Sequence, residues 1–277
     1  EGSSKRSQRP RRPIWPRQVI TASILETSSI SSSTNKHEQR VAIVTGASRG
    51  IGRAISTRLA TDGCIVALIA RNADALAEVQ AEIEKAGGTA SCHVCDLQVS
   101  AAFVSTIESI VEQYGRVDVL VNNAGMTRDG LMLRMTDEDF DCVINVNLKA
   151  VFAGCRTVAR PMMKQRWGRM INITSVTGLS GNAGQANYAA AKAGLVGLTK
   201  TIAKENAKKE ITVNCLSLGY FSAGMQKRLP KSVSEAIQSE IPKGVFGDPQ
   251  NILLAVKFLI EADYVTGSVI NINGGLY

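Results

Sequence analysis

Residues 41–52 read Val-Ala-Ile-Val-Thr-Gly-Ala-Ser-Arg-Gly-Ile-Gly, and this stretch decides the fold. Its apolar start, Val41–Val44, predicts a buried strand, and a helix is expected from Arg53 to Thr61. The glycines between them let the backbone turn sharply and approach a phosphate, and a helix N-terminus offers free N–H donors. Their spacing, Gly-x-x-x-Gly-x-Gly, differs from the common dinucleotide pattern. We predict a nucleotide site here; the alternative is a tight turn without a ligand.

Outward from this stretch, strand-like and helix-like segments alternate along the chain, which predicts an α/β fold with a parallel sheet covered on both faces. The expected strands are Val41–Val44, Ile65–Ile69, Ala90–Cys95, Val117–Val121, Arg169–Thr174, Thr212–Leu216 and Ser268–Ile272. Seven parallel strands give a single doubly wound Rossmann domain, which we place at residues 39–277. In such sheets ligands bind at the carboxyl ends of strands, where the glycine loop, Asn122–Gly125, Ser175 and Gly219 would converge.

A second motif is the pair Tyr188 and Lys192, with Ser175 upstream. The alanine-rich stretch 185–200 predicts a helix, so these two side chains share a face. An ammonium beside a phenol favours the phenolate and would lower the tyrosine pKa toward neutrality. A phenol tuned in this way can exchange a proton with a substrate oxygen. The spacing alone also occurs by chance on surface helices.

Taken together, the motifs resemble the short-chain dehydrogenases/reductases, and within them the β-ketoacyl-[acyl-carrier-protein] reductase branch. The resemblance runs from about Gln39 to Tyr277. It rests on the motifs Thr45–Gly52, Asn122–Gly125, Asn147, Ser175, Tyr188 and Lys192, and for the branch on Thr127–Leu131 and Gly181–Tyr188.

The resemblance implies a nicotinamide dinucleotide cofactor. The residues it assigns to cofactor binding are Gly46, Ser48, Arg49, Gly50, Ile51, Gly52, Asp96, Leu97, Asn123, Ala124, Gly125, Tyr188, Lys192, Gly219 and Phe221. After the second strand, where an acidic residue would select NAD, the chain has Ala70-Arg71-Asn72. Arg71 and Arg49 suit a 2′-phosphate, which favours NADP(H). A solvated residue at a helix start is the alternative for Arg71, and a simple turn is the alternative for Asn122–Gly125.

The same resemblance implies the reduction of a ketone. Hydride transfer builds negative charge on the carbonyl oxygen, and Tyr188 would donate the proton that neutralises it. Ser175 would hold that oxygen. Lys192 would bind the nicotinamide ribose, and Asn147 would hold a water that links Lys192 to solvent. A structural amide inside a helix is the alternative for Asn147. We expect no metal ion.

The branch also implies an acidic carrier protein as partner and a homotetramer. Arg166 and Lys209 match positions that the family uses for carrier docking; solvated surface charge is the alternative. One stretch departs from the family, which usually has Pro-Gly after the sixth strand and a threonine four residues later. Here Leu218 and Ala223 stand at these positions. The departure concerns either cofactor affinity or the order of the loop from Gly219 to Pro242, and Ser222, one residue off, is the alternative hydroxyl. We expect this loop to be mobile without cofactor.

The charge of the chain is concentrated at its start. Of the 32 basic and 24 acidic residues, eight and three lie in residues 1–40, so the rest is nearly balanced and a general nucleic-acid role is disfavoured. Residues 1–38 carry nine serines and three prolines without apolar periodicity, which predicts a disordered, transit-peptide-like segment. The family points to the plastid ahead of the mitochondrion. A disordered tail without a targeting function is the alternative. No uninterrupted apolar run is long enough to predict a membrane span.

Six scattered cysteines are expected to be free thiols. Cys92 and Cys95 have a metal-like spacing, but on a strand they point to opposite faces.

The main functional prediction is NADPH-dependent reduction of 3-oxoacyl-[acyl-carrier-protein] to the 3-hydroxyacyl form in type II fatty acid synthesis. Two alternatives remain at this point. One is a related enzyme acting on acyl-CoA or another small carbonyl or alcohol. The other is a non-catalytic cofactor-binding scaffold subunit.

Overall fold

The computed structural model describes residues 39–222 and 231–277. The predictions for residues 1–38, and for residues 223–230 of the loop that follows the sixth strand, lie outside the described residues.

Seven parallel strands form one sheet in the order β3-β2-β1-β4-β5-β6-β7. Their bounds are β1 Val41–Thr45, β2 Ile65–Ala70, β3 Thr89–Val94, β4 Val119–Asn122, β5 Gly168–Ser175, β6 Ile211–Leu218 and β7 Val269–Ile272. All seven predicted strands are confirmed to within two residues at each end. The reason is that a strand buried on both faces is a short, nearly continuous apolar run, which the sequence displays directly.

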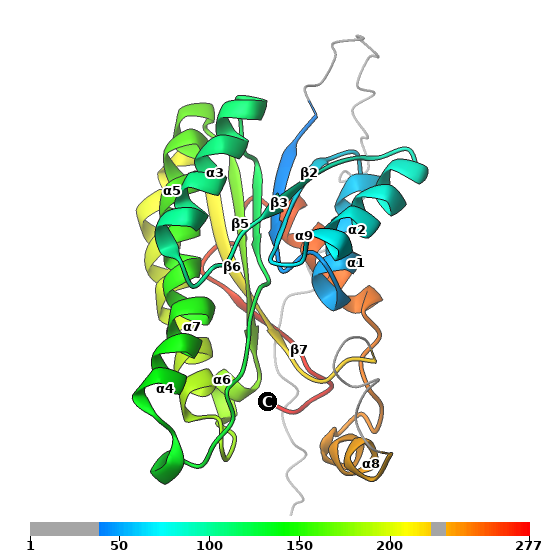
Figure 1. Cartoon of the computed structure of the whole chain (residues 1–277), viewed down its shortest axis with the longest axis vertical. Helices are drawn as coiled ribbons and strands as arrows, with labels where there is room; N and C mark the ends of the chain where they lie inside the picture. The colour runs from blue at the N-terminus through cyan, green and yellow to red at the C-terminus, as the bar shows by residue number, and fades with distance from the viewer. Residues whose placement is uncertain (1–38, 223–230) are drawn as a thin grey trace, which may run out of the picture. The chain divides into compact units, whose positions relative to one another are not determined.

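Helices cover both faces of the sheet. Their bounds are α1 Gly50–Thr61, α2 Ala73–Lys85, α3 Ser100–Tyr114, α4 Asp137–Ile144, α5 Ala150–Gln165, α6 Thr177–Ser180, α7 Ala186–Asn206, α8 Lys231–Glu240 and α9 Gln250–Glu261, with the 3₁₀ turns η1 Met132–Arg134 and η3 Ala207–Lys209 and the π-helix η2 Asn145–Lys149. Figure 1 shows α1, α2 and α9 on one side of the sheet and α3, α5 and α7 on the other. This is the doubly wound Rossmann arrangement that the alternation predicts.

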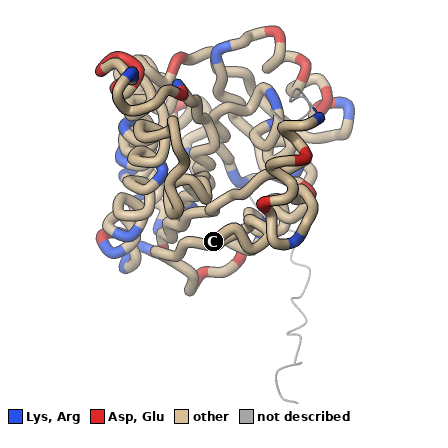
Figure 2. The backbone as a smooth tube through the Cα atoms, turned by 90° about the horizontal axis from the view of Figure 1, so that it is seen from below, with Lys and Arg blue, Asp and Glu red and all other residues tan. Residues whose placement is uncertain are grey.

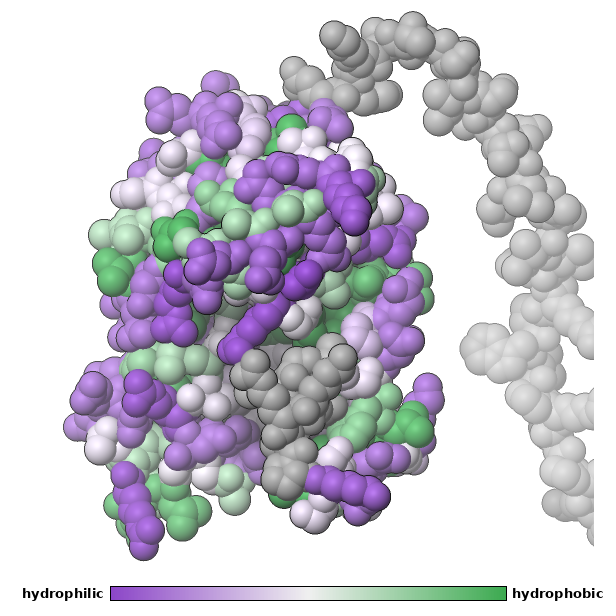
Figure 3. Space-filling view, turned by 45° about the vertical axis from the view of Figure 1, so that its right-hand side comes forward, coloured by the Kyte–Doolittle hydropathy of each residue, from purple (hydrophilic) through white to green (hydrophobic). Residues whose placement is uncertain are grey.

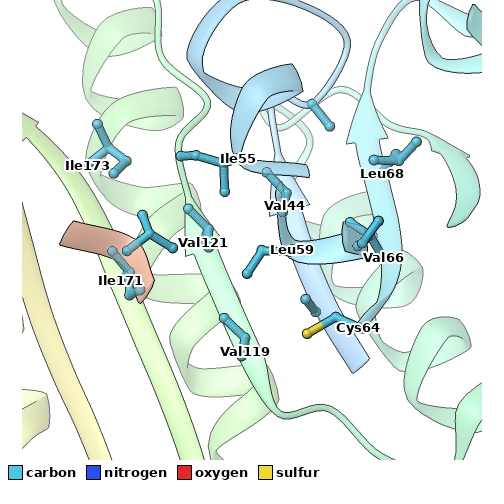
Figure 4. Packing of buried hydrophobic residues seen from close by; sticks show 14 of the residues in the cluster. Val44, Ile55, Leu59, Cys64, Val66, Leu68, Val119, Val121, Ile171 and Ile173 are labelled. Carbon is cyan, nitrogen blue, oxygen red and sulfur yellow. The ribbon is translucent and has the colours of Figure 1, made fainter. Parts of the chain in front are cut away.

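The core has one hydrophobic cluster on each face of the sheet. On the first face, Val44 and Val66 pack with Ile55 and Leu59 of α1 (Figure 4). On the other face, neighbouring strand residues such as Ile43 pack with Phe103 and other residues of α3, α5 and α7. Because alternate side chains of a buried strand serve opposite clusters, the sheet is held in place from both sides.

The strand order reverses between β1 and β4, which are neighbours although β2 and β3 come between them in the chain. The loops that leave the carboxyl ends of β1 and β4 therefore run in opposite directions and open a crevice between them. The glycine loop follows β1 and Asn123 follows β4. The fold thus puts both predicted cofactor segments at the switch point.

Helices α4 and α5 are joined by η2 into one helix from Asp137 to Gln165. Within the described ranges this is the one helix that meets the length and hydropathy expected of a membrane span, and half of the qualifying window is buried inside the fold. Val158 and Met162 of α5 belong to the core cluster on that face of the sheet. Packing inside the domain accounts for the buried apolar residues of this helix, whereas Phe140 and Phe152 are exposed.

The six cysteines are free thiols, as predicted. Cys92 packs against the cluster that contains α1, whereas Cys95 belongs to the cluster that contains α3, so the two side chains do serve opposite faces. Residues 39–222 and 231–277 contain no group of three or more potential metal ligands.

The surface carries charges of both signs. Figure 2 shows lysine and arginine interspersed with aspartate and glutamate around the backbone, and the face in Figure 3 mixes hydrophilic and hydrophobic residues. The nearly balanced composition of the domain is therefore also balanced in space.

Candidate active site

The glycine loop after β1 is a tight turn that only glycine can make. Gly46 and Gly50 have φ values of +66° and +56°, in the left-handed region that side chains disfavour. A Cβ atom on Gly52 would collide with the carbonyl oxygen of Gly46. The loop therefore folds back on the first turn of α1, and its glycines allow close packing against Asn123 and Ala124.

Thr45 joins this loop to the one that follows β4. Its hydroxyl accepts hydrogen bonds from the backbone N–H groups of Asn123 and Ala124, both at 3.0 Å. The Asn123 side chain returns the contact, because its Nδ2 donates to the Thr45 carbonyl oxygen at 2.9 Å. Sequence reasoning assigned no role in the site to Thr45. A threonine at the very end of β1, directly before Gly46, was the available signal.

The residues at the switch point fit a dinucleotide. Helix α1 begins at Gly50 with no side-chain N-cap, so the N–H groups of its first turn remain available to a pyrophosphate. Ser48 is partly exposed and Arg49 is exposed beside them, and Ile51 packs at the edge of the core. Arg71 follows β2 and is also exposed.

Farther along the same edge, Asp96 is partly exposed and its carboxylate accepts a hydrogen bond from the Gln98 N–H at 3.0 Å. Leu97 is buried in the cluster that contains α3, so its backbone is the part that could meet an adenine. Both residues follow β3, as the prediction requires.

Lys192 lies inside the protein on α7. Its side chain is 3 % exposed, and Nζ donates to the Ile173 carbonyl oxygen of β5 at 2.8 Å. The same Nζ lies 5.6 Å from the centroid of the Tyr188 ring. Burial lowers the pKa of Lys192 to about 8, against a weaker opposite effect of Cys215. The cation is therefore held close to its point of deprotonation at physiological pH.

The expected lowering of the Tyr188 pKa by Lys192 is wrong for this structure. Burial raises the pKa of Tyr188, a hydrogen bond with the Ser175 hydroxyl lowers it, and the charge of Asp129 raises it. The Lys192 ammonium bonds a backbone carbonyl and faces the ring of the tyrosine, so desolvation dominates the phenol. Ser175 and Tyr188 are nevertheless brought together, as the prediction requires.

Asn147 reaches the same spot through the π-helix η2. Its Nδ2 donates to the carbonyl oxygens of Met126 and Val143 at 2.8 and 2.9 Å, and its Oδ1 accepts from the Met126 N–H at 3.3 Å. A Cβ atom on Gly125 would lie 2.7 Å from Asn147 Oδ1 and 3.6 Å from Lys192 Nζ. Gly125 therefore leaves the space that Asn147 and Lys192 share, and π-bulges of this kind are frequent at functional sites.

The start of α7 is tied to the loop that follows β4 and to α4. Asn187 Nδ2 donates to the carbonyl oxygens of Arg128 and Asp139 at 2.9 and 3.2 Å, and the Gly130 N–H donates to the Gly184 carbonyl oxygen at 2.9 Å. Asn187 is fully buried. It positions the residue that follows it, Tyr188, and sequence reasoning assigned it no role in the site. Its place directly before the tyrosine was the signal.

The segment after β6 is partly described. The Gly219 N–H donates to the Ile272 carbonyl oxygen at 3.0 Å, and a Cβ atom on Gly219 would lie 2.7 Å from the Asn273 Cα. Phe221 is buried and pairs with Gly247 in an isolated bridge, so its backbone rather than its ring could face a cofactor. Leu218, in place of the family's proline, continues β6. Ala223 and part of the loop predicted to be mobile lie outside the described residues.

Arg166 and Lys209 are brought together with each other but not with the catalytic residues. Both are exposed and precede β5 and β6, whose first residues are paired in register. Ser175 ends β5, seven residues or about 23 Å farther along the sheet than Gly168. The predicted docking residues thus lie at the amino ends of the strands, and the predicted catalytic residues at the carboxyl ends.

Comparison with known proteins places this site in a family. Residues 40–234 match the family model described as short chain dehydrogenase. The chain is 44 % identical over 241 residues to the 3-oxoacyl-[acyl-carrier-protein] reductase FabG of Thermotoga maritima, covering 86 % of this chain and 98 % of that protein. It is 44 % identical over 242 residues to the protein of the same name from Escherichia coli K12, covering 87 % and 98 %. The chain belongs to the short chain dehydrogenase family.

Proposed function

We propose that this protein is a 3-oxoacyl-[acyl-carrier-protein] reductase that uses NADPH to form the 3-hydroxyacyl product in fatty acid synthesis. The support is the convergence of Ser175, Tyr188, Lys192 and Asn147 beside a glycine loop, in a chain 44 % identical to reductases of that name.

The chain's own residues divide the work of ketone reduction. NADPH bound along the glycine loop would supply the hydride. The Ser175 hydroxyl, at the carboxyl end of β5, holds the substrate carbonyl oxygen next to the Tyr188 phenol. Tyr188 then donates its proton to that oxygen as negative charge develops. A partly buried phenol with a raised pKa stays protonated at neutral pH, so it is ready to act as the acid.

Lys192 and Asn147 support the tyrosine. The Lys192 ammonium lies 5.6 Å from the Tyr188 ring centroid without lowering the resting pKa of that phenol, and its proposed role is to bind the nicotinamide ribose. Asn147 fixes the loop at Met126 with its amide and keeps Gly125 close to Lys192.

The observation that carries the proposal is the position of the partly buried Tyr188 beside both Ser175 and Lys192, and a comparison of substrates tests the proposal. NADPH oxidation is measured with acetoacetyl-carrier protein, and with acetoacetyl-CoA and NADH as parallel arms. We expect the highest kcat/KM with carrier-bound substrate and NADPH. Higher efficiency with acetoacetyl-CoA would point to the acyl-CoA enzyme, and no turnover with any substrate would point to a scaffold.

The preference for NADPH rests on the charge at the end of β2. Arg71 and Arg49 are exposed and, within residues 39–222 and 231–277, form no ion pair, so both guanidinium groups are free to meet a 2′-phosphate. Arg71→Ala should lower kcat/KM for NADPH about tenfold and leave that for NADH unchanged. An equal loss with both cofactors would contradict the role of Arg71.

Carrier docking is proposed at Arg166 and Lys209. Because these residues lie at the amino ends of β5 and β6, a carrier held there would present its acyl chain to a site on another copy of the chain. This geometry goes with the proposed homotetramer. Light scattering of the purified protein tests the assembly, and a monomer at micromolar concentration would contradict it.

Residues 1–38 are proposed to be a plastid-targeting sequence. The support is their composition, rich in arginine and serine and poor in acids, together with a family match that begins at residue 40. Fusion of residues 1–38 to a fluorescent protein in plant cells should direct it to plastids. Mitochondrial or cytosolic fluorescence would overturn this assignment.

A further inference from the structure

The face of β5 that packs against α7 is unexpectedly polar. Asn172 and Thr174 point to this side, alternating with the apolar residues Ile171 and Ile173 that pack in the opposite cluster. Asn172 and Thr174 are 0 % and 2 % exposed. Strands buried in parallel sheets are usually apolar on both faces, and a buried polar group costs stability unless it is hydrogen-bonded. Both side chains therefore call for an explanation.

Thr174 bonds the catalytic helix at Lys192 itself. Its hydroxyl donates to the Lys192 backbone carbonyl oxygen at 2.8 Å, while Lys192 Nζ donates to the carbonyl oxygen of the neighbouring Ile173, also at 2.8 Å. The lysine is thus held by adjacent residues of one strand, at its backbone and at its charged end. Gly178 packs on the same point, because a Cβ atom there would lie 2.7 Å from the Lys192 carbonyl carbon.

Asn172 makes a second hydrogen-bonded connection between β5 and α7, two helical turns farther along the helix. Its Nδ2 donates to the Thr199 hydroxyl at 2.8 Å, and Thr199 is seven residues after Lys192 and fully buried on the same face. The chain of bonds continues sideways, since Asn172 Oδ1 accepts from Asn122 Nδ2 of β4 at 2.8 Å. On the other side, Thr199 Oγ1 lies 3.0 Å from Cys215 Sγ of β6.

This connection joins elements that carry different parts of the site. Strand β5 ends in Ser175, helix α7 carries Tyr188 and Lys192, and Asn122 directly precedes the cofactor-cleft residue Asn123. A slide of α7 along β5 would change the distance from Ser175 to Tyr188. Apolar packing tolerates such slides more readily than hydrogen bonds do, because burial is non-directional and a hydrogen bond is not.

We propose that Thr174, assisted by the Asn172–Thr199 pair, is a positioning residue that sets the register of α7 on β5 and so holds Lys192 and Tyr188 against Ser175. We call these three residues, Thr174, Asn172 and Thr199, the register seam. The hydrogen bonds that define the seam are all made with the protein itself. The proposal rests on the proposed reductase function for its kinetic consequences, but its structural consequence is measurable without substrate.

Thr174→Val tests the seam, because valine keeps the shape of threonine and removes the hydroxyl. The Lys192 carbonyl keeps its bond within α7, so no buried acceptor is abandoned. We expect kcat to fall about tenfold with KM nearly unchanged, since a small displacement of catalytic groups is costly. Thr174→Ser should recover kcat, because serine restores the hydroxyl.

The second readout is the titration of Lys192 in the cofactor-free protein, followed by NMR of ¹³C-labelled lysine and assigned with Lys192→Met. Lys192 titrates near pH 8 because it is buried, and the titratable groups that face it are Tyr188 and Cys215. A loosened α7 lets water reach Nζ, so Thr174→Val should raise the midpoint by about half a pH unit. Thr174→Ser should leave it in place.

Thr157→Val is the matched control, because its hydroxyl donates at 2.8 Å to Ala153 within its own helix. It should change neither readout. Thr199→Val provides a second break in the seam if Thr174→Val does not fold, with the same expected directions. An unchanged Lys192 midpoint in the folded variants overturns the proposal, whatever happens to kcat. If the parent protein reduces no 3-oxoacyl substrate, the titration still decides this proposal separately.

Discussion

Two buried charges lie at opposite ends of the sheet and are treated in opposite ways. Asp118, at the amino end of β4, is 0 % exposed and accepts from Arg116 at 2.8 Å through both carboxylate oxygens, and from the Val41 N–H at 2.8 Å. Lys192, at the carboxyl end, is 3 % exposed and donates to one backbone carbonyl. The Asp118 carboxylate is held by several partners, whereas the Lys192 ammonium has a pKa close to physiological pH.

This difference indicates that Asp118 has a structural role and Lys192 a chemical one. A buried charge with several partners holds elements together, whereas one whose pKa is displaced by desolvation is suited to proton transfer. Other charged residues at the amino end of the sheet also hold elements together through several contacts. Arg40 and Arg169 each lie 4.3 Å from the Trp167 ring centroid, and Arg169 also donates to the Ile260 carbonyl oxygen at 2.9 Å. These contacts tie β1, β5 and α9 together.

The largest expected effect comes from the carboxyl end. Tyr188→Phe removes the proposed proton donor and should lower kcat about a thousandfold, since general acid catalysis contributes on that scale. Thermal unfolding should change little, because phenylalanine fills the same space. Tyr264→Phe, at a side chain that is 99 % exposed, is the control and should keep full activity. Activity within tenfold of the parent would remove Tyr188 from the mechanism.

At the amino end the expected effect is on stability. Asp118→Asn removes the buried charge that Arg116 and the Val41 N–H bond, and should lower the free energy of unfolding by about 3 kcal/mol, as broken buried ion pairs do. Urea denaturation measures this. The kcat of the folded fraction should be unchanged, because the substitution is remote from Ser175. A loss of kcat at full folding would mean that the two ends are coupled, and would break the comparison.

Lys192→Met should raise stability and abolish activity, whereas Asp118→Asn should lower stability and keep activity. Its folded pKa of about 8 lies below the ordinary 10.5, so the unfolded chain binds more protons between these pH values and stability rises as pH rises through them. At pH 7 the parent carries the full desolvation cost. The methionine variant should therefore be inactive yet more stable there, by up to about 3 kcal/mol.

The advantage of the Lys192→Met variant should shrink between pH 8 and pH 10.5, as the parent's lysine loses its proton. Urea denaturation of both proteins across this range measures the trend. A variant less stable than the parent at pH 7 would mean that Lys192 is structural, like Asp118.

The smallest expected effect concerns the exposed charges at the amino end. Charge reversal of Arg166 and Lys209 should raise KM for carrier-bound substrate about tenfold and leave that for a small soluble ketone unchanged. Lys85→Glu, an exposed reversal on α2, is the control. Equal effects on both substrates would sink the docking assignment.

Much of this architecture could be predicted because its signals are local. Buried strands such as β1 are apolar runs, and the turns of Gly46 and Gly50 need a residue that tolerates positive φ. Ser175, Tyr188 and Lys192 could be assigned to one site because strand ends converge in a parallel sheet.

What the sequence did not disclose depends on contacts between distant segments. The pKa of Tyr188 is set by burial and by where Lys192 Nζ points, and neither is a property of their spacing in the chain. Thr174 and Asn172 look like weak points in a strand until α7 is placed against them. The position of Arg166 at the far end of the sheet follows from topology rather than from charge.

The π-helix at Asn145–Lys149 has a consequence for the evolution of this helix. An extra residue in the ladder turns the side chains on one side of it by about 100° relative to those on the other. The stretch before it serves the site, because the Val143 carbonyl oxygen accepts from Asn147. The stretch after it serves the core through Val158. Deletion of one residue there would barely shorten the helix but would rotate one of these surfaces out of place, so insertions and deletions at this point are far more damaging than most substitutions.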